Sequence, residues 1–364
     1  MNNKVLRLAV AAGAVGVMGV VLAGMMLLLA RPSASQVQQA PTPPVAAQQV
    51  QQPAPTPAAL LPLVARGWPP EAPPADGWLQ YLNQYRAMSG LPPLAENPEW
   101  SAGAALHARY IVKNDVVTHI EDPANAWYTP AGAAAGEASN VMGSTNVDAP
   151  DGYAIDTWMQ APFHAVGILD PELATTGFGS YREAGGYLAM GAALDVIRGL
   201  ETVPATVTFP IYWPGDGETV ALSEHRGEYP DPLSSCPGYS VPAGLPLLLQ
   251  IGPGDLSPTV TDHSLVGNGQ PLEHCVFDET TYENPDATLQ ALGRAVLAAR
   301  DAIVLIPRLP LSVGTTYTAS ITVDGVAYTW SFSVAELAPG ARSAPAEGVG
   351  LNAIPPRPDL WRTP

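Results

Sequence analysis

The first 75 residues restrict where a folded core can begin. Residues 8–30 read LAVAAGAVGVMGVVLAGMMLLLA, contain no charged side chain and are flanked by Arg7 and Arg31. A helix rising 1.5 Å per residue would carry this stretch across about 34 Å, enough for the hydrocarbon core of a bilayer. The sequence therefore predicts that residues 1–31 are either a signal anchor, which is a transmembrane helix, or a signal peptide that is cleaved.

The flanking charges predict how this segment is oriented. Lys4 and Arg7 precede it, and positive side chains tend to stay on the cytoplasmic side of a membrane. Secretory signal cores usually have about 7–15 apolar residues, which favours the uncleaved anchor, while the small residues 33–36 offer a cleavage site. We expect an N-in anchor, or a secreted protein after cleavage, with everything beyond residue 31 extracytoplasmic.

Residues 32–75 and 337–364 are poor in the side chains that build a core. The first stretch consists almost entirely of Pro, Ala, Gln, Ser, Thr and Val, and the second is also rich in Pro. Such sequences bury too little apolar surface to offset the loss of chain entropy. The sequence predicts a disordered stalk before residue 76 and a disordered tail after residue 336, with folded segments between them.

The balance of charge excludes one class of partner. The chain has 16 Lys and Arg against 33 Asp and Glu, a net charge of -17, and no run of basic residues. An acidic surface repels phosphate backbones. Nucleic acid is therefore not an expected partner, whereas the membrane is one through residues 1–31.

Cys236 and Cys275 are the two cysteines of the chain. Outside the cytoplasm, an even pair within one segment most simply forms a disulfide. Closing a loop of about 40 residues stabilises a domain by roughly 4 kcal/mol in the chain-entropy treatment. We expect this disulfide rather than a metal site, because no further ligands stand at a useful spacing.

Residues 76–200 mix helical and strand patterns, which predicts an α+β fold. Apolar side chains recur at helical spacing in two segments, and His107 falls on the core side of the second. Gly90 and Pro92 end the first helix, and Asn97 and Pro98 begin the second. The expected elements are helices at 77–90, 97–115 and 151–160, a Gly-rich loop at 128–140, and paired strands at 175–181 and 185–196.

Several short motifs in residues 76–200 occur in a fixed order. They are N-Q-Y-R in the first helix, a G-L-P-P-L turn, H-A-R-Y in the second helix, a lone His, a G-E pair, then W-M…F-H and G-F-G-S-Y. This order resembles the CAP superfamily, in its bacterial branch of SCP-like extracellular domains. The resemblance implies an α-β-α sandwich with a central cleft, in a protein that is commonly secreted.

The resemblance also implies a cleft site. His119 and His164 fall on the two cleft histidines of the family, and Glu137 falls on the Glu of its G-E-N type motif. As a hypothesis, these three residues bind a divalent cation: zinc, magnesium or calcium. Two features depart from the family pattern. Ala161 occupies the position of a second Glu, and the G-H-Y/F-T-Q-x-V-W signature of eukaryotic members is absent.

Other roles for these residues stay open. Glu121 or Asp122 is an alternative source of a carboxylate, from the loop after His119. In a purely structural interpretation, His119 and Glu137 make a polar contact that fixes the loops, and His164 caps a helix end. No positioned nucleophile is visible, because the G-x-S-x-G context is missing. The sequence leaves open whether the protein is an enzyme.

Residues 202–336 are rich in strand patterns separated by Pro and Gly. In residues 315–335, apolar side chains alternate on both sides of Asp324-Gly325, which predicts a hairpin with a type I′ turn and aromatic side chains in the core. Residues 286–301 predict one helix. The pattern is similar to bacterial Ig-like modules, which are β-sandwiches found on surface proteins.

Three further histidines lie in this second segment, and none stands at ligand spacing from another. His274 neighbours Cys275 and is expected to be structural, whereas His225 and His263 are expected at the surface. The whole pattern predicts a surface-anchored or secreted protein whose cation-capable cleft binds a lipid, a cell-wall component or a protein. One alternative is a metal-assisted hydrolase of peptides or cell-wall polymers. Another is an adhesion protein that acts through residues 202–336.

Overall fold

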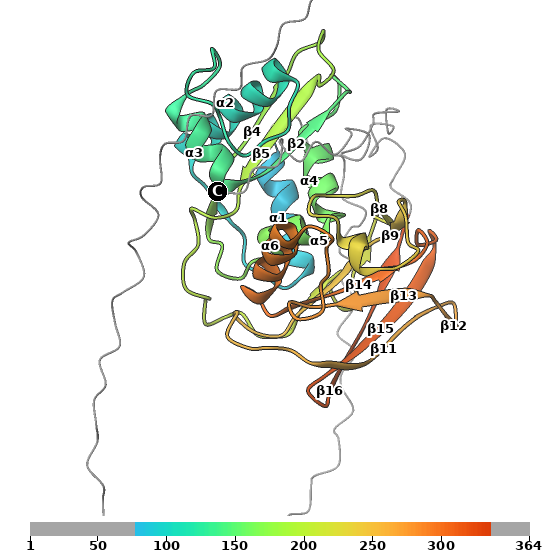
Figure 1. The fold of residues 1–364 in the computed structure, drawn as a ribbon. Helices are drawn as coiled ribbons and strands as arrows, with labels where there is room; N and C mark the ends of the chain where they lie inside the picture. Colours follow the sequence, from blue (N-terminus) through green and yellow to red (C-terminus); the bar gives the residue numbers. More distant parts are fainter. Residues whose placement is uncertain (1–76, 336–364) are drawn as a thin grey trace, which may run out of the picture. The chain divides into compact units, whose positions relative to one another are not determined.

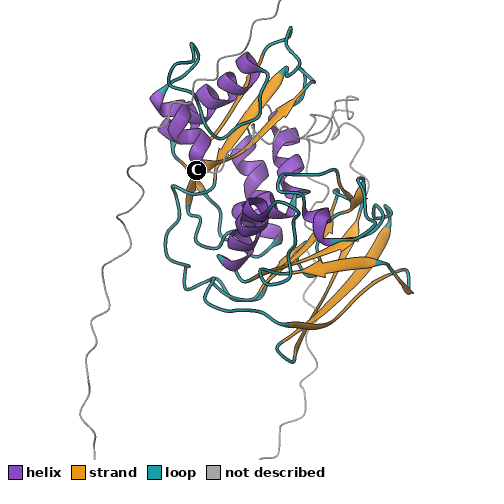
Figure 2. Ribbon diagram, viewed as in Figure 1, coloured by secondary structure: helices purple, strands orange, loops and turns teal. Residues whose placement is uncertain are grey.

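The structure, a computed structural model, describes residues 77–335 (Figure 1). The predictions for residues 1–31, 32–75 and 337–364 lie outside the described residues. No helix within residues 77–335 is long and apolar enough to span a membrane. Helices predominate up to residue 200 and strands after it, as Figures 1 and 2 show together.

Five helices and a three-stranded sheet build residues 77–200, which confirms the predicted α+β character. The sheet is antiparallel with the order β2-β5-β4, and a short parallel pair joins β1 to β3. The helices are α1 Trp78–Met88, α2 Pro98–Asn114, α3 Pro130–Ala138, α4 Asp151–Met159 and α5 Pro162–Ile168. The strands are β1 Ala95–Glu96, β2 Ser139–Ser144, β3 Thr175–Thr176, β4 Phe178–Arg182 and β5 Met190–Asp195.

Helices cover both faces of this sheet. On one face, Val141 and Ala193 join apolar side chains of α2 and α3 in a small cluster. On the other face, Met142 and Leu194 belong to a larger cluster that includes α1, α4 and α5. The alternation of side chains along each strand supplies both clusters. The result is a helix-sheet-helix order of layers, as the CAP resemblance implies.

Helix α2 lies directly on the sheet. Asn97 caps its first turn by accepting hydrogen bonds from the amides of Glu99 and Trp100 at 3.0 and 3.3 Å. On β4, a Cβ added to Gly179 would stand 2.1 Å from the backbone nitrogen of Ala105. Only glycine therefore allows this close approach of helix and strand.

The prediction of a Gly-rich loop at 128–140 is wrong. Pro130–Ala138 form α3, which runs directly into β2. Thr129 caps the helix by accepting a hydrogen bond from the amide of Gly132 at 3.0 Å, and Pro130 occupies the first turn. The segment has small residues and no apolar period, so packing against α2 rather than a local pattern stabilises it.

Two larger sheets and one helix build most of the second segment. The four-stranded sheet has the order β13-β14-β10-β6, and the five-stranded sheet has the order β12-β11-β15-β16-β7. The elements of the first sheet and the helix are β6 Ile211–Trp213, β10 Leu247–Gln250, β13 His274–Phe277, β14 Ala302–Pro307 and α6 Ala287–Ala298. The elements of the second sheet are β7 Thr219–Val220, β11 Val260–Gly267, β12 Gln270–Pro271, β15 Thr315–Val323 and β16 Val326–Val334. A further pair joins β8 Glu224–His225 to β9 Ala243–Gly244.

The predicted hairpin is confirmed in β15 and β16. Asp324 and Gly325 both have positive φ, 51° and 82°, as a type I′ turn requires. Trp330 and Phe332 are buried, so the aromatic side chains of the hairpin do belong to the core. The helix predicted at 286–301 is present as α6. An Ig-like topology for residues 202–336 stays a prediction.

The two segments share one hydrophobic core. A single apolar cluster contains side chains of α1, α4 and α5 together with those of β10, β14 and β16. Polar contacts also join the segments. Gln250 Nε2 donates to the Leu169 carbonyl at 3.1 Å, and Arg300 Nε donates to the Asp170 carboxylate at 2.7 Å. Residues before and after 201 therefore fold against each other.

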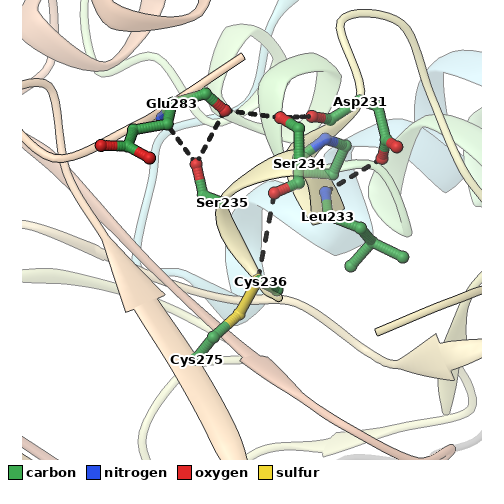
Figure 3. Close-up of a disulfide and its surroundings, with 8 residues drawn as sticks. Asp231, Leu233, Ser234, Ser235, Cys236, Cys275 and Glu283 are labelled. Carbon is green, nitrogen blue, oxygen red and sulfur yellow. Dashed lines mark hydrogen bonds between the residues drawn. A yellow bond between two sulfur atoms is a disulfide. The ribbon is translucent and has the colours of Figure 1, made fainter. Parts of the chain in front are cut away.

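The Cys236–Cys275 disulfide is present, as predicted. It joins the end of the 3-10 helix Pro232–Ser235 to β13, and the Ser234 hydroxyl donates to the Glu283 carbonyl at 2.6 Å (Figure 3). The prediction that His225 lies at the surface is wrong. This side chain is buried, and its Nδ1 is 2.8 Å from the Gln160 carbonyl oxygen at the end of α4.

Candidate functional site

His119 lies in the loop between α2 and α3. Its Nδ1 donates to the carbonyl oxygen of Gly136 at 3.0 Å, so Nε2 is the unprotonated nitrogen of the neutral ring. A Cβ on Gly136 would stand 2.6 Å from the His119 carbonyl oxygen and 2.3 Å from the His107 ring, so a glycine is required there.

The surroundings of His119 keep its imidazole neutral. The pKa of His119 is lowered to about 4, chiefly by burial. The hydrogen bond to Gly136 acts in the opposite direction, and His164 and His107 contribute smaller decreases. Glu137 follows Gly136 on α3 and its side chain is exposed. The neutral imidazole of His119 is therefore hydrogen-bonded to Gly136, the residue that precedes the exposed carboxylate of Glu137.

His107 and Glu121 form a buried pair behind this loop. His107 Nδ1 is 3.0 Å from the Glu121 carboxylate and its Nε2 is 2.7 Å from the Thr118 carbonyl oxygen. The predicted core position of His107 is confirmed, because the side chain is fully buried. Glu121 and Asp122 were the alternative sources of a cleft carboxylate, and neither lines the cavity described below. Glu121 is occupied in the core, and Asp122 accepts the Ala124 amide of its own loop at 2.9 Å.

His164 lies on α5 and pairs with a residue far along the chain. Its Nδ1 is 2.6 Å from a carboxylate oxygen of Glu228. The same carboxylate accepts the amides of Phe163 and His164 at 3.1 and 3.2 Å. Both partners are buried. Glu228 therefore caps the start of α5 and fixes the histidine ring.

A cavity of about 210 Å³ lies beside His119 and Glu137. Both side chains line it, together with apolar side chains from three parts of the chain and a few further polar groups. His164 is not in its wall. The apolar wall consists mainly of Phe163 and Gly167 of α5, Val196 and Ile197 after β5, and Leu292 and Val296 of α6.

Residues 79–192 match the model of the CAP family, described as the cysteine-rich secretory protein family. The chain therefore contains a CAP domain. No curated protein matches the chain. A CAP domain and a disulfide indicate an extracellular protein.

The candidate site extends beyond the CAP domain. His119, Glu137 and His164 lie within the matched residues, whereas Glu228 and α6 lie outside them. Glu228 brings a carboxylate to His164. Ala161, where the resemblance implies a second Glu, is the uncharged N-cap residue of the same helix α5. Sequence reasoning missed Glu228, because the partners are 64 positions apart. The one sequence feature that pointed to a carboxylate from elsewhere was the absence of a Glu at position 161.

Arg300 places a positive charge in the cavity wall. It follows α6, and its Nε donates to the Asp170 carboxylate at 2.7 Å, so the guanidinium is held in place. Asp170 itself is buried. A group in the cavity would therefore meet apolar side chains together with the polar groups of Arg300, His119 and Glu137.

The predicted cation ligands do not form a ready chelate. Within residues 77–335, no group of three or more His, Cys, Asp and Glu side chains is placed to hold one ion. His119 and Glu137 border the cavity, while the Nδ1 of His164 is engaged by Glu228. Cation binding by these three residues stays a prediction. As arranged, the cavity beside His119 and Glu137 has a mainly apolar wall with a few polar groups.

Proposed function

We propose that this is an extracytoplasmic ligand-binding protein, anchored by residues 1–31 or secreted, that holds the apolar part of a lipid between its CAP domain and α6. The cavity carries the proposal: its wall is mainly apolar, and His119, Glu137 and Arg300 are among its few polar groups. Small-molecule sites typically combine apolar walls with a few polar groups that fix the ligand's orientation. The cavity volume fits one short alkyl chain or part of a longer one.

The proposal predicts a dependence on chain length. Each methylene that the cavity buries contributes about 0.8 kcal/mol, or roughly a fourfold gain in affinity. We would titrate the full chain with alkyl carboxylates and alcohols of increasing length, by calorimetry. Affinity is expected to rise steadily with length and then level off once the cavity is filled.

Helix α6 offers matched variants for this experiment. Leu292→Gln and Val296→Gln place amides in the cavity wall at half-buried positions, and Ala295→Gln changes an exposed position of the same helix. The first two should weaken binding by about tenfold or more, since a polar group without a partner in an apolar site costs about 1–3 kcal/mol. Equal affinities in all three variants, or no dependence on chain length, would contradict the proposal.

A metal-assisted hydrolase of peptides or cell-wall polymers is a second candidate. The observation that favours it is the neutral His119 beside the exposed Glu137 at one cavity. In this candidate, hydrolysis disappears both on chelation and in Glu137→Ala. Hydrolysis that survives both changes would remove the metal and Glu137 from the mechanism.

A third candidate is adhesion to a protein or cell-wall partner through an Ig-like module at residues 202–336. Cross-strand hydroxyl pairs on the outer face of β15 and β16, such as Thr318 with Ser331 at 2.8 Å, favour it by forming a polar surface. Thr318→Arg would abolish capture of the partner through this face. Undiminished capture would contradict the candidate.

A further inference from the structure

Outside the cleft, two histidines from different sheets meet. His263 lies on β11 of the five-stranded sheet and His274 on β13 of the four-stranded sheet. His263 Nδ1 is 2.9 Å from His274 Nε2, and the ring planes are inclined by 76°. Two imidazole nitrogens therefore face each other where solvent has access. Neither ring is in the wall of the cleft cavity.

A second hydrogen bond fixes the tautomer of His274. Its Nδ1 donates to the carbonyl oxygen of Leu272 at 2.7 Å, so Nε2 presents its lone pair toward His263. Metal-bound histidines show the same pattern, with one nitrogen on a carbonyl oxygen and the other on the ion.

We infer that His263 and His274 form a binding site for a divalent transition-metal ion, with Cu²⁺ preferred. Two nitrogens about 2.0–2.1 Å from one ion and at right angles around it lie about 2.9 Å apart. The two imidazole nitrogens have this separation. Ligand–metal–ligand angles near 90° are typical of tetragonal Cu²⁺ and Ni²⁺. In tetrahedral zinc sites these angles are wider. Such an ion lies off the line between the two nitrogens, at equal distance from both. On binding, the proton of His263 moves from Nδ1 to Nε2, which frees the Nδ1 lone pair for the ion.

The strands hold both ligands in position before an ion binds. His263 is paired with Ile321 of β15, and His274 is paired with Pro307 of β14. Cys275, next to His274, is tied into the disulfide. Ligands that are already ordered lose little conformational entropy on binding.

The charge around the pair favours a cation. The chain has a net charge of -17, and Asp262 and Glu273 immediately precede the two histidines. The Asp262 carboxylate lowers the cost of bringing a positive ion to this edge, whereas the Glu273 carboxylate is paired with Arg308 at 2.6 Å. Since residues 77–335 contain no group of three or more metal-binding side chains, water fills the remaining coordination positions.

Copper titration of the metal-free full chain tests the site. Calorimetry and electron paramagnetic resonance would follow Cu²⁺ binding in a buffer that does not bind copper, with Ni²⁺ and Zn²⁺ in parallel. We expect one saturable Cu²⁺ site with two nitrogen ligands. Mutation of a residue that is only hydrogen-bonded to a metal ligand typically lowers metal affinity 10–100-fold. His263→Ala and His274→Ala should therefore each weaken binding by at least about tenfold and leave one nitrogen ligand.

His119→Ala is the matched control, because it removes a cleft histidine and leaves the pair intact. Its copper affinity should equal that of the parent, and unchanged thermal unfolding would show that all variants are folded. No saturable copper site, or a site that only His119→Ala removes, overturns the inference. The result is independent of lipid binding, so either proposal can fail alone.

Discussion

At the scale of single residues, Glu228 has the largest structural role in the candidate site. It satisfies the ring of His164 and two amides at the start of α5, all within the core. Glu228→Ala leaves these donors buried without an acceptor, which typically costs about 3–5 kcal/mol. We expect urea denaturation to show a loss of this size. Glu228→Gln, which keeps an acceptor oxygen, should lose clearly less. Equal losses in the two variants would show that the acceptor contributes little.

His119 gives a prediction for pH. Burial holds its folded pKa near 4, below the ordinary value of 6.5, so the unfolded chain binds the proton first as pH falls. His119 therefore costs the protein no stability above about pH 6.5, and it destabilises the fold progressively between about pH 6.5 and 4. His119→Gln should flatten the decline of the urea midpoint over this window. Parallel curves for parent and variant would contradict the assigned burial of the ring.

At the scale of elements, α5 is fixed at both ends by side chains from other parts of the chain. Glu228 binds its first amides, and the guanidinium of Arg86 in α1 donates to the carbonyls of Ile168 and Asp170 at 2.8 and 2.9 Å. An anion at the start of a helix and a cation at its end both favour the helix dipole. These contacts hold Phe163 and Gly167 in the cavity wall, although α5 has only seven residues.

Arg86 should be indispensable to this arrangement. Its side chain is fully buried, and burial lowers its pKa to about 10, so it stays charged at neutral pH. Arg86→Met leaves the carbonyls that it binds without a donor, and we expect a loss of about 3–5 kcal/mol in urea denaturation. Arg86→Lys keeps the charge but not the fork of donors, so its loss should be intermediate. A loss below about 1 kcal/mol in Arg86→Met would refute the role.

Elements with a strong local pattern were predictable from the sequence. The helix at 97–115, the helix at 286–301 and the hairpin around Asp324 have clear apolar periods or a diagnostic turn, and all are present. Helix α3 was missed because small residues give no periodic contrast. His225 was misplaced for a related reason, since a two-residue strand shows no pattern that reveals its burial.

At the scale of the whole molecule, prediction failed where distant segments meet. The CAP resemblance identified His119 and Glu137, and both border the cavity. It could not identify α6 as part of the cavity wall or Glu228 as the partner of His164, because both lie outside the residues that match the CAP family. Contacts over such separations have no local period, and only the folded chain brings them together. A site whose residues come from two segments could therefore be identified only from the folded structure.

This shared construction predicts that the CAP domain does not fold well alone. Residues 77–200 without the rest lose the Glu228 cap of α5, the Arg300 partner of Asp170 and part of the common apolar cluster. A chain of residues 77–200 should therefore unfold without a sharp thermal transition and bind a hydrophobic dye, whereas residues 77–335 should unfold cooperatively. If the shorter chain unfolds sharply at a similar temperature, the CAP domain is independent, and α6 adds only a wall to its cleft.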